Sequence, residues 1–409
     1  MNAKSEITKA RNQHKPVANI PPGLTTKATI VVVGAGAFGG WTSLWLLRKG
    51  FKVINVDLWG PGNASSSSGG ETRLLRCVYG IGNLYTRLAA RSLELWLENE
   101  KSLDKQLFFP SGALWFINDS YDGGFVEASL QVLDALKLSY ERLTPTEAGK
   151  RYPALHVSDL SGLVLEKKAG YLLAREACIS VTKRFIAEGG TYVQSEALPG
   201  VISNGRLNNL LLKNEKLEGD AYVFACGPWM PEIFPELLGN KIIVSRQEVF
   251  YFGMPSGLVS SFEDHLPPWL DLDREHMYYG FPQTQNRGFK IAAHGKGKIF
   301  DPTCEDRIVS GDELEKARNY LAFRFPVLKH VPLVESRVCQ YSNTPDEHFI
   351  MDQHPEAANV WLLGGGSGHG FKHGPALGEL AAAAIAGESS VPDEFSLKRF
   401  DLYNRQPPV

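Results

Sequence analysis

Apolar and polar positions follow their most regular pattern between residues 28 and 58. A run of β-branched residues at 30–33 is followed by a stretch whose apolar side chains recur at helical spacing up to Gly50, and then by a second apolar run at 52–56. Short buried runs are typical of strands, and the spacing between them is that of a helix. The pattern therefore predicts a complete βαβ unit of about 30 residues.

The rest of the chain alternates between helical and strand-like patterns. Helical periodicity returns at 82–106 and 125–150, and residues 107–118 alternate like a hairpin strand. Asn-Gly within residues 200–214 indicates a tight hairpin turn. The remaining predictions are a helix at 178–190, strands at 191–198 and 220–229, aromatic strand-like pieces across 243–300, and a strand, glycine turn and helix at 360–387.

The first turn of the βαβ unit carries a glycine signature. Gly34, Gly36 and Gly39 form a G-x-G-x-x-G motif between the first strand and the helix, and Asp57 ends the second strand. The first glycine permits the tight turn, the second lets backbone approach a pyrophosphate, and the third allows close helix–strand packing. An acid at the position of Asp57 can accept hydrogen bonds from a ribose. The motif predicts a dinucleotide site and does not choose between NAD and FAD.

We therefore predict an α/β (α+β) fold with a Rossmann-type dinucleotide-binding domain and a second, mostly antiparallel substrate domain. Pieces of mononucleotide-binding type lie at both ends and in the middle of the chain, which implies a discontinuous domain. The expected division is a disordered leader at 1–27, the dinucleotide-binding domain at 28–82, 156–240 and 331–400, and the substrate domain at 83–155 and 241–330.

Composition narrows the class of protein. The 409 residues are 43% hydrophobic and carry a net charge of −2, so nothing favours nucleic acid or an anionic membrane as partner. The five cysteines are scattered without a C-x-x-C pair, which argues against a disulfide framework or a zinc site, and no metal is expected. No apolar run approaches the ~20 residues of a membrane helix, and the N-terminus lacks a secretory signal. We expect a cytoplasmic protein.

Several charged residues outside the motif could carry chemistry. Arg73 and Arg76 follow a Ser/Gly-rich loop that should cover the cofactor. Lys290 and His294 are four residues apart in a predicted strand and therefore lie on one face of it. They either line a site or are solvent-exposed residues of an edge strand.

Two further segments lie near the end of the chain. In "VESRVCQYSNTPDEHFIMDQHP", Cys339 and Tyr341 point to the same face of a predicted strand, so the thiol is a core residue, a redox sensor or a cofactor attachment point. In "GGGSGHGFKHG", Gly366 and Gly368 belong to a glycine turn suited to close backbone approach, and Lys372 follows them.

Taken together, these segments resemble the monomeric sarcosine oxidase family of FAD-dependent amine oxidases, which includes N-methyltryptophan, L-pipecolate and fructosyl amino acid oxidases. The resemblance covers about residues 28–400 and rests on "VVVGAGAFGG", "GETRLLR", "YYGFPQ", "GFKIAAHG", "CQYSNTPDEHFIMDQHP" and "GGGSGHGFK". It implies a fold like those of glutathione reductase and D-amino-acid oxidase. It also implies a monomer whose partners are a small amine substrate and O2.

The resemblance implies roles for each of these residues. FAD would be bound through Gly34, Gly36, Gly39, Asp57, Gly366 and Gly368, with Cys339 bonded to the flavin 8α-methyl. Arg76 and Lys372 would bind the substrate carboxylate and Tyr341 would face the pocket. Lys290 would lie near flavin N5 where O2 reacts, His294 beside the substrate amine, and Arg73 near the flavin ring. Gly69 stands where small-substrate members carry a histidine, and Leu270 roughly where they carry a methionine, which indicates a roomier pocket.

The function so implied is oxidation of a secondary (N-alkyl or cyclic) amino acid. Hydride would pass to flavin N5, the imine would leave, and O2 would be reduced to hydrogen peroxide. The alternatives are an amine dehydrogenase using another acceptor, an oxidase of a bulkier amine (glycated, opine-like or a primary L-amino acid), and a non-catalytic FAD-binding subunit. An NAD-dependent dehydrogenase would leave residues 334–374 without a role.

Overall fold

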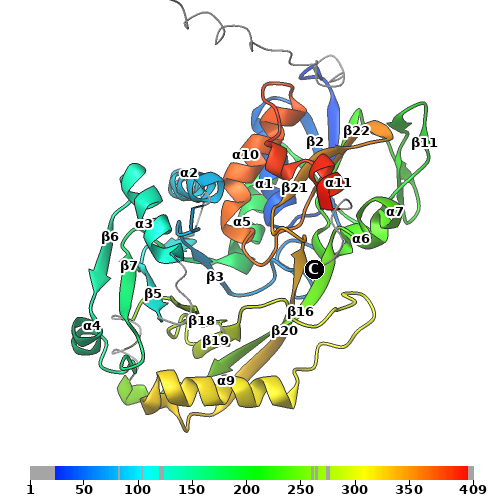
Figure 1. Cartoon of the computed structure of the whole chain (residues 1–409). Coiled ribbons are helices and arrows are strands. Elements are labelled where there is room, and N and C mark those ends of the chain that lie inside the picture. The colour runs from blue at the N-terminus through cyan, green and yellow to red at the C-terminus, as the bar shows by residue number, and fades with distance from the viewer. Residues whose placement is uncertain are drawn as a thin grey trace, which may run out of the picture.

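The computed structural model describes residues 24–81, 83–103, 105–118, 124–258, 262, 266–272 and 277–403. Most of the predicted leader therefore lies outside the described residues. Two large sheets dominate the molecule, and helices cover both of them (Figure 1). No helix in the described ranges is long and apolar enough to cross a membrane.

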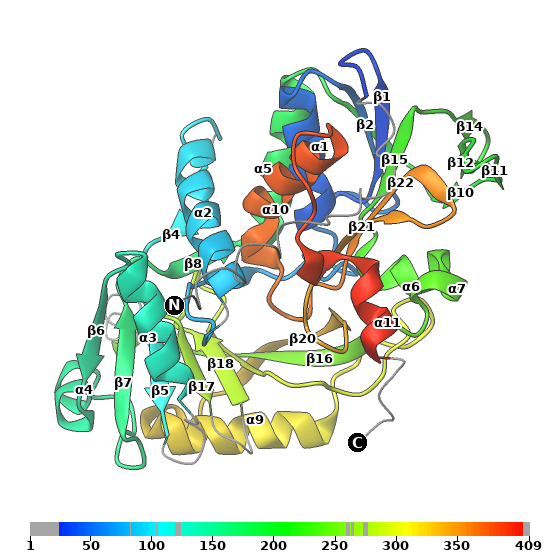
Figure 2. The ribbon, with the colours of Figure 1, turned by 45° about the horizontal axis from the view of Figure 1, so that its top comes forward.

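The first sheet contains the predicted βαβ unit. Its strand order is β21-β22-β15-β1-β2-β9, parallel throughout except for the β21–β22 hairpin. These strands span Ile350–His354, Ala357–Gly364, Ala221–Phe224, Thr29–Val33, Lys52–Asp57 and Thr191–Gln194. The helices α1 (Ala37–Arg48), α5 (Ala174–Ala187) and α10 (Gly374–Ile385) lie together over one face (Figure 2).

Alternation along β1 explains why this sheet is buried on both faces. Ile30 and Val32 pack into the core beneath the helices, whereas Val31 and Val33 pack into a second core on the opposite face. Each of the four side chains is buried. A run of consecutive β-branched residues is what a strand covered on both faces requires. The predicted βαβ unit, with its strand buried on both faces, is confirmed.

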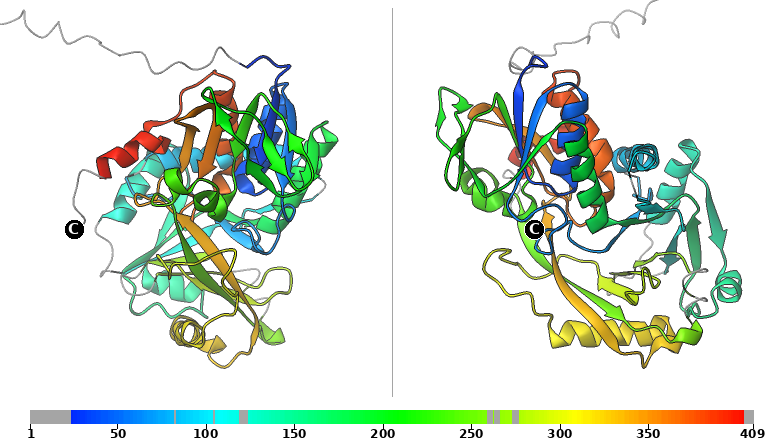
Figure 3. Two further views of the ribbon diagram at one scale, coloured as in Figure 1. Left: turned by 90° about the vertical axis from the view of Figure 1, so that its right-hand side faces the viewer. Right: turned by 180° about the vertical axis from the view of Figure 1, so that it is seen from behind.

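The second sheet has eight strands in the order β20-β16-β19-β18-β17-β5-β7-β6, and only the β17–β5 pair is parallel. In that order they span Leu333–Asn343, Ile243–Phe252, Phe289–Ala293, Met277–Phe281, Trp269–Leu272, Ala113–Ile117, Gly162–Glu166 and Tyr140–Leu143. The long strands β16 and β20 run side by side (green and orange in the left view of Figure 3). Helix α9 (Gly311–Arg324) covers the outer face of this sheet.

Alternation along β19 decides which side chains face inward. Phe289 and Ile291 pack against the helix α9 side, together with Tyr320 and Leu321 of that helix. The intervening Lys290 must then point to the opposite face, toward the first sheet. The inward face of the second sheet therefore meets the carboxyl ends of the first sheet's strands.

Smaller elements connect the two sheets. A three-stranded sheet, β3-β8-β4, consists of Thr72–Leu75, Gly170–Leu173 and Phe108–Phe109. Helix α2 (Asn83–Glu100) packs beside α10, and α3 (Phe125–Ala135), α4 (Pro145–Arg151), α6 (Met230–Ile233), α7 (Pro235–Leu238) and α11 (Phe400–Tyr403) are peripheral. The remaining strands of the described residues are short: β10 (Ala197–Pro199), β11 (Ile202–Ser203), β12 (Arg206–Leu207), β13 (Leu210–Leu212) and β14 (Lys216–Leu217). The predicted Asn-Gly hairpin is confirmed, because Asn204 and Gly205 have φ of 51° and 72° between β11 and β12.

Two expectations from the pattern are corrected. Residues 125–150 are not helical throughout: residues 140–143 form β6, because they pair with β7 at the edge of the large sheet. Moreover, β7 and β20 lie within segments expected to belong to the dinucleotide-binding domain, yet both pair in the eight-stranded sheet. Hydrogen-bonded pairing with distant strands decided their place, and local pattern carries no information about it.

Candidate active site

The glycine turn after β1 has the geometry that its sequence predicted. Gly34 has φ of +108°, and a Cβ there would lie 2.4 Å from the carbonyl oxygen of Ala225. A Cβ on Gly39 would lie 2.0 Å from the carbonyl oxygen of Gly34. Neither position can hold a side chain, because the backbone that follows β15 lies against Gly34 and helix α1 packs on the turn at Gly39.

Helix α1 presents its N-terminus to the same turn. Its N-cap is Gly36, no side chain caps it, and no acidic residue lies in its first turn. The amide of Ala37 donates to Ser68 Oγ at 3.1 Å, so the Ser-rich loop lies directly over this end. A helix N-terminus that lies beside a glycine turn and has no acidic residue in its first turn is suited to a phosphate group.

Asp57 ends β2 beside this turn. Its Oδ2 accepts from the amide of Ala35 at 2.8 Å, and its Oδ1 accepts from the amides of Trp59 and Gly60 at 3.0 and 2.7 Å. Burial raises the pKa of this carboxyl, and the three amides oppose that shift. The carboxylate is thereby held at the cavity wall, where a ribose hydroxyl could also reach it.

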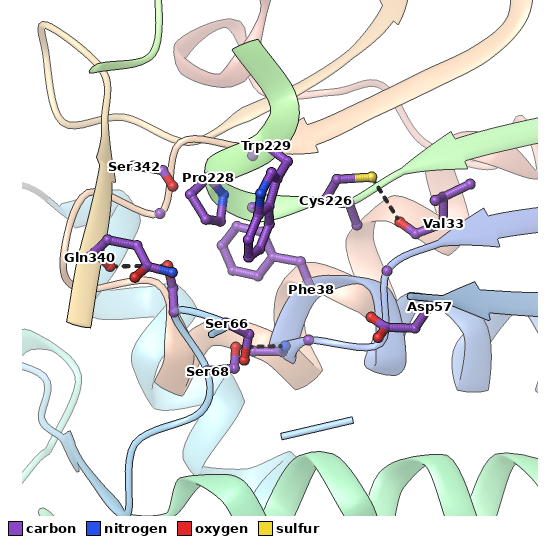
Figure 4. A pocket seen from close by; sticks show the side chains of 18 of the residues that line it. Val33, Phe38, Asp57, Ser66, Ser68, Cys226, Pro228, Trp229, Gln340 and Ser342 are labelled. Carbon is purple, nitrogen blue, oxygen red and sulfur yellow. Dashed lines mark hydrogen bonds between the residues drawn. The ribbon is translucent and has the colours of Figure 1, made fainter. Parts of the chain in front are cut away.

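A cavity of about 440 Å³ begins at this turn. That volume falls within the roughly 300–1,000 Å³ that ligand sites occupy. Figure 4 shows Val33, Phe38, Asp57, Cys226, Trp229 and Gln340 around it, with Ser66 and Ser68 on the loop below. From Asp57 the cavity extends past Phe38 to Arg73, Tyr341, Gly366 and Gly368. The glycine motif and the C-terminal glycine turn thus line one continuous site.

Cys339 lies beside Arg73 and Ser67, which line the cavity. Its Sγ is 3.6 Å from Nη2 of Arg73, and the same nitrogen donates to the carbonyl of Ser67 at 2.7 Å. Gly368 approaches the ring of the neighbouring Tyr341 so closely that a Cβ there would lie 2.7 Å from it. The predicted shared orientation of the thiol and the phenol toward one site agrees with these contacts.

Lys290 is only 2% exposed and points at the same region from β19. Its Nζ donates to the carbonyl and hydroxyl oxygens of Thr72 at 3.0 and 3.2 Å and lies 4.6 Å from the ring centre of Phe281. Burial, followed by the charge of Arg73, lowers the pKa of this ammonium well below its usual value. The reading of Lys290 as a solvated edge residue is therefore wrong, because packing of both sheets encloses it.

Arg76 and Lys372 form a second cationic group. Arg76 donates from Nη1 to the carbonyl of Val78, and Lys372, 4% exposed, donates from Nζ to the carbonyl of His369 at 2.8 Å. Burial and then Arg76 lower the pKa of Lys372 well below its usual value. Within the described ranges neither cation forms an ion pair with a carboxylate, so both have donors for an anionic ligand.

His294 connects this cationic group to Tyr341. It lies one residue beyond β19, and its Nδ1 is 3.4 Å from the Tyr341 hydroxyl. Burial, Arg76 and Lys372 together lower the pKa of His294 to about 4. The imidazole is therefore neutral at physiological pH. Burial also raises the pKa of Tyr341 well above its usual value, which keeps the phenol protonated.

Several residues at the site escaped the sequence analysis. Trp59 and Trp229 pack with ring centres 4.8 Å apart at the cavity wall, and Trp229 donates to Thr303 at 3.0 Å. Trp115 and Tyr79 lie against Arg76. Local sequence offers only weak signals for these residues, since a tryptophan after a Gly-Pro turn or within an apolar strand reads as core.

Comparison with known proteins agrees with this geometry. Residues 29–384 match the family described as FAD dependent oxidoreductase. Monomeric sarcosine oxidase of Bacillus sp. (strain B-0618) is 30% identical over 377 residues, which cover 90% of this chain and 94% of that protein. N-methyl-L-tryptophan oxidase of Salmonella dublin is 28% identical and covers 91% and 99%.

Solved structures show the same fold. L-proline dehydrogenase from P. horikoshii superposes with a TM-score of 0.79 at 21% identity, covering 93% of this chain and 99% of that one. Amadoriase I from Aspergillus fumigatus, a fructosyl amine:oxygen oxidoreductase, gives 0.79 at 17% identity with 94% and 93% coverage. Fold and site thus define a dinucleotide-binding flavoprotein of two-sheet architecture. The chain belongs to the FAD dependent oxidoreductase family, and its relatives include monomeric sarcosine oxidases.

Proposed function

We propose that this protein is an FAD-dependent oxidase of secondary amino acids, with an N-alkyl or cyclic amine as substrate. The observation that carries the proposal is a pair of cations, the half-buried Arg76 and the buried Lys372, near His294, whose pKa both of them lower. The proposal is also supported by the similarity of this chain to two relatives whose names denote oxidases of N-methyl amino acids.

The residues present suit FAD. The glycine turn excludes side chains where a pyrophosphate would lie, and the N-terminus of helix α1 lies beside that turn. The cavity runs from Asp57 to Arg73, whose Nη2 lies 3.6 Å from the sulfur of Cys339. We propose that Gly34, Gly36, Gly39, Asp57, Gly366 and Gly368 hold the cofactor and that Cys339 bonds to it. Bound FAD supplies two-electron chemistry: hydride leaves the carbon next to the amine nitrogen, an imine remains, and O2 is reduced to hydrogen peroxide.

The protein itself binds and orients the substrate and tunes the electrostatic environment of the cofactor. Arg76 and Lys372 bind the substrate carboxylate, which charge-assisted hydrogen bonds favour. Because these cations surround the site, the substrate amine loses its proton more readily, and only the neutral amine has the lone pair that oxidation requires. His294, neutral at physiological pH, accepts or donates a hydrogen bond beside that amine, and Tyr341 borders the same space.

Lys290 and Arg73 set the electrostatic potential at the end of the site near Cys339. Lys290 is held by Thr72 with its ammonium facing the site, where a positive charge would stabilise electron transfer to O2. Arg73 lies between the thiol of Cys339 and the Ser67 carbonyl and would tune the field at the cofactor.

We further propose that the two sheets correspond to cofactor and substrate domains, with β7 and β20 in the latter, and that the protein is a monomer in the cytoplasm.

The deciding experiment is anaerobic bleaching of the flavin absorbance with sarcosine, L-pipecolate, L-proline, N-methyl-L-tryptophan and a fructosyl amino acid. Bleaching by one of them, together with oxygen uptake in air, is the expected result. Bleaching without oxygen uptake would instead identify a dehydrogenase. Bleaching by dithionite but by none of the five would overturn the proposed substrate class and direct attention to primary or opine-like amines.

The carboxylate role is tested separately. Lys372→Met and Arg76→Lys should each raise KM by about 10- to 100-fold, since a hydrogen bond to a charged group is worth roughly 1.5–3 kcal/mol. Lys398→Met, at the exposed C-terminal end of the chain, is the control. An unchanged KM in both active-site variants would show that the carboxylate binds elsewhere.

A further inference from the structure

The guanidinium of Arg76 packs on two aromatic rings. Its Cζ is 4.4 Å from the ring centre of Tyr79 and 4.9 Å from that of Trp115. A guanidinium donates hydrogen bonds only in its own plane, whereas its faces favour aromatic rings. Two rings on one guanidinium therefore restrict its rotation, which fixes the plane in which it can bind a carboxylate.

Trp115 is held in place from its far end. It lies on β5, is 2% exposed, and donates from Nε1 to Oε1 of Glu166 at 2.7 Å. Glu166, the last residue of the adjacent strand β7, is 4% exposed, and its Oε2 accepts from the amide of Cys77 at 2.8 Å. One buried carboxylate thus ties the Trp115 indole to the backbone that follows Arg76.

Tyr79 is also fixed by its polar end. Its hydroxyl is 2.8 Å from Nε2 of His373 and 3.3 Å from Nδ1 of His369. His373 is fully buried, and its ring centre lies 5.6 Å from that of Tyr79. The ring of Tyr79 therefore cannot swing away from Arg76 without breaking these hydrogen bonds.

The ring of Tyr79 also contacts the second cation, Lys372. Nζ of Lys372 is 5.1 Å from the ring centre of Tyr79, so one π-system contacts both groups. Two cations this close in a buried site repel each other, and the lowered pKa of Lys372 reflects that repulsion together with burial. The Tyr79 ring and the negative Glu166 offset part of the repulsion, and an anionic ligand would offset the rest.

We propose that Tyr79 and Trp115 are positioning residues that clamp Arg76 with their rings and so make the site selective for a carboxylate lying in the guanidinium plane. The inference rests on the proposed function, because it takes Arg76 and Lys372 to be the carboxylate site. It extends that function by assigning the site's orientation to two residues that do not touch the substrate charge themselves. Glu166 and His373 act one step further away by holding the two rings.

The test measures carboxylate binding to the FAD-loaded protein without turnover. Methoxyacetate has the shape of an N-methyl amino acid but no amine to oxidise, and methoxyacetamide is its neutral counterpart. Their dissociation constants can be measured from changes in the flavin absorbance. We expect methoxyacetate to bind wild-type protein at least 10-fold more tightly than methoxyacetamide.

The variants separate the ring face from other properties of each residue. Tyr79→Leu and Trp115→Leu should weaken methoxyacetate binding by about 5- to 30-fold, which corresponds to the roughly 1–2 kcal/mol of a desolvated cation–π contact. Tyr79→Phe and Trp115→Phe keep a ring face but lose the hydrogen bond to His373 or Glu166. Because the ring still packs on the guanidinium, we expect a smaller loss, within about 3-fold of wild type. In turnover, the leucine variants should raise KM while the rate at saturating substrate changes by less than about 2-fold. Phe252→Leu removes a ring 5.3 Å from Arg318, outside the site, and is the matched control.

Each outcome decides between the two proposals. If wild-type protein does not prefer methoxyacetate over methoxyacetamide, the carboxylate site itself is overturned, and the clamp with it. If wild-type protein shows the preference but the leucine variants bind within 2-fold of it, only the clamp is overturned. Equal losses in the leucine and phenylalanine variants would also overturn it, because the ring face would not matter. If Tyr79→Leu fails to retain FAD, Tyr79→Met keeps the apolar volume without a π-face and carries the same expectation.

Discussion

The sulfur of Cys339 lies 3.6 Å from Nη2 of Arg73, although 266 residues separate the two along the chain. Cys339 comes from the long strand β20 of the eight-stranded sheet, and Arg73 comes from β3, which follows the Ser-rich loop over the cavity. This contact joins β20 of the eight-stranded sheet to β3 of the three-stranded sheet, at the proposed attachment point of the cofactor.

Replacing Cys339 by serine should release the flavin from denatured protein. After acid precipitation, yellow flavin should remain in the wild-type pellet and appear in the supernatant of Cys339→Ser, because serine cannot form the proposed thioether. Cys226→Ser is the control, since Cys226 lines the same cavity but donates only to Val33 O at 3.6 Å. Release of flavin from the wild type would contradict attachment through Cys339.

Lys290→Met should slow reoxidation of the reduced flavin by O2 by about 100- to 1,000-fold, the usual loss when a preorganised charge is removed from a reacting centre. Stopped-flow mixing of reduced protein with O2 measures this step. Anaerobic reduction by substrate should change by less than about 3-fold. The exposed Lys296, replaced by methionine, serves as control. An unchanged reoxidation rate in Lys290→Met would remove Lys290 from the oxygen step.

His294 should make the protein less stable in acid. Its pKa is about 4 in the folded protein and about 6.5 when unfolded, so above pH 6.5 it is neutral in both states. As pH falls from 6.5 to 4, only the unfolded state gains the proton, and the free energy of unfolding drops by up to about 3 kcal/mol. The stability difference between wild type and His294→Asn should therefore shrink over this range in urea titrations followed by tryptophan fluorescence.

The exposed His330, replaced by asparagine, is the control for this pH dependence. The half-buried His369 and the buried His373 contribute in the same direction, since desolvation lowers the pKa of each, so His294→Asn should remove only its own share. Stability curves of wild type and His294→Asn that stay parallel from pH 7 to 4 would show that His294 titrates normally.

Gly69 should tolerate no side chain. A Cβ there would lie 1.9 Å from the carbonyl oxygen of Asn63, within the tight loop that places Ser68 over helix α1. Gly69→Ala should lower the melting temperature and weaken FAD retention on gel filtration, with a loss of about 2–3 kcal/mol in stability. Gly311→Ala is the control, because a Cβ at Gly311 meets nothing within 4 Å. Full FAD retention in Gly69→Ala would mean that the loop adjusts freely.

The Gly69 contact also explains why this chain has a glycine where small-substrate members of the resembled family carry a histidine. A histidine at this position, as the resemblance leads one to expect, would need a different course of the loop. The Ser/Gly composition and the loop conformation are therefore linked: the chain turns tightly at Asn63 and Ser66, with Ser66 N donating to Asn63 O at 3.2 Å. Whether this makes the pocket roomier remains a prediction that the substrate panel tests.

The dinucleotide-binding half of the site could be predicted from sequence because it is local. Gly34, Gly36, Gly39 and Asp57 lie within one βαβ unit, where strand, turn and helix follow one another, and steric limits at the turn dictate the glycines. The cationic residues were also found, since charged residues beside apolar strands and glycine turns stand out in the pattern. Their partners were not found in this way.

By itself, therefore, the sequence determined the fold class, the glycine turn and the kinds of chemical group available to the site. Only the tertiary structure decided that Tyr79 and Trp115 contact Arg76, that Arg73 meets Cys339, and that β20 belongs to the eight-stranded sheet. The physical reason is the distance along the chain over which each kind of interaction acts. Backbone conformation and side-chain periodicity act over a few residues, whereas these contacts depend on strand register and on the packing of two sheets, to which the whole chain contributes.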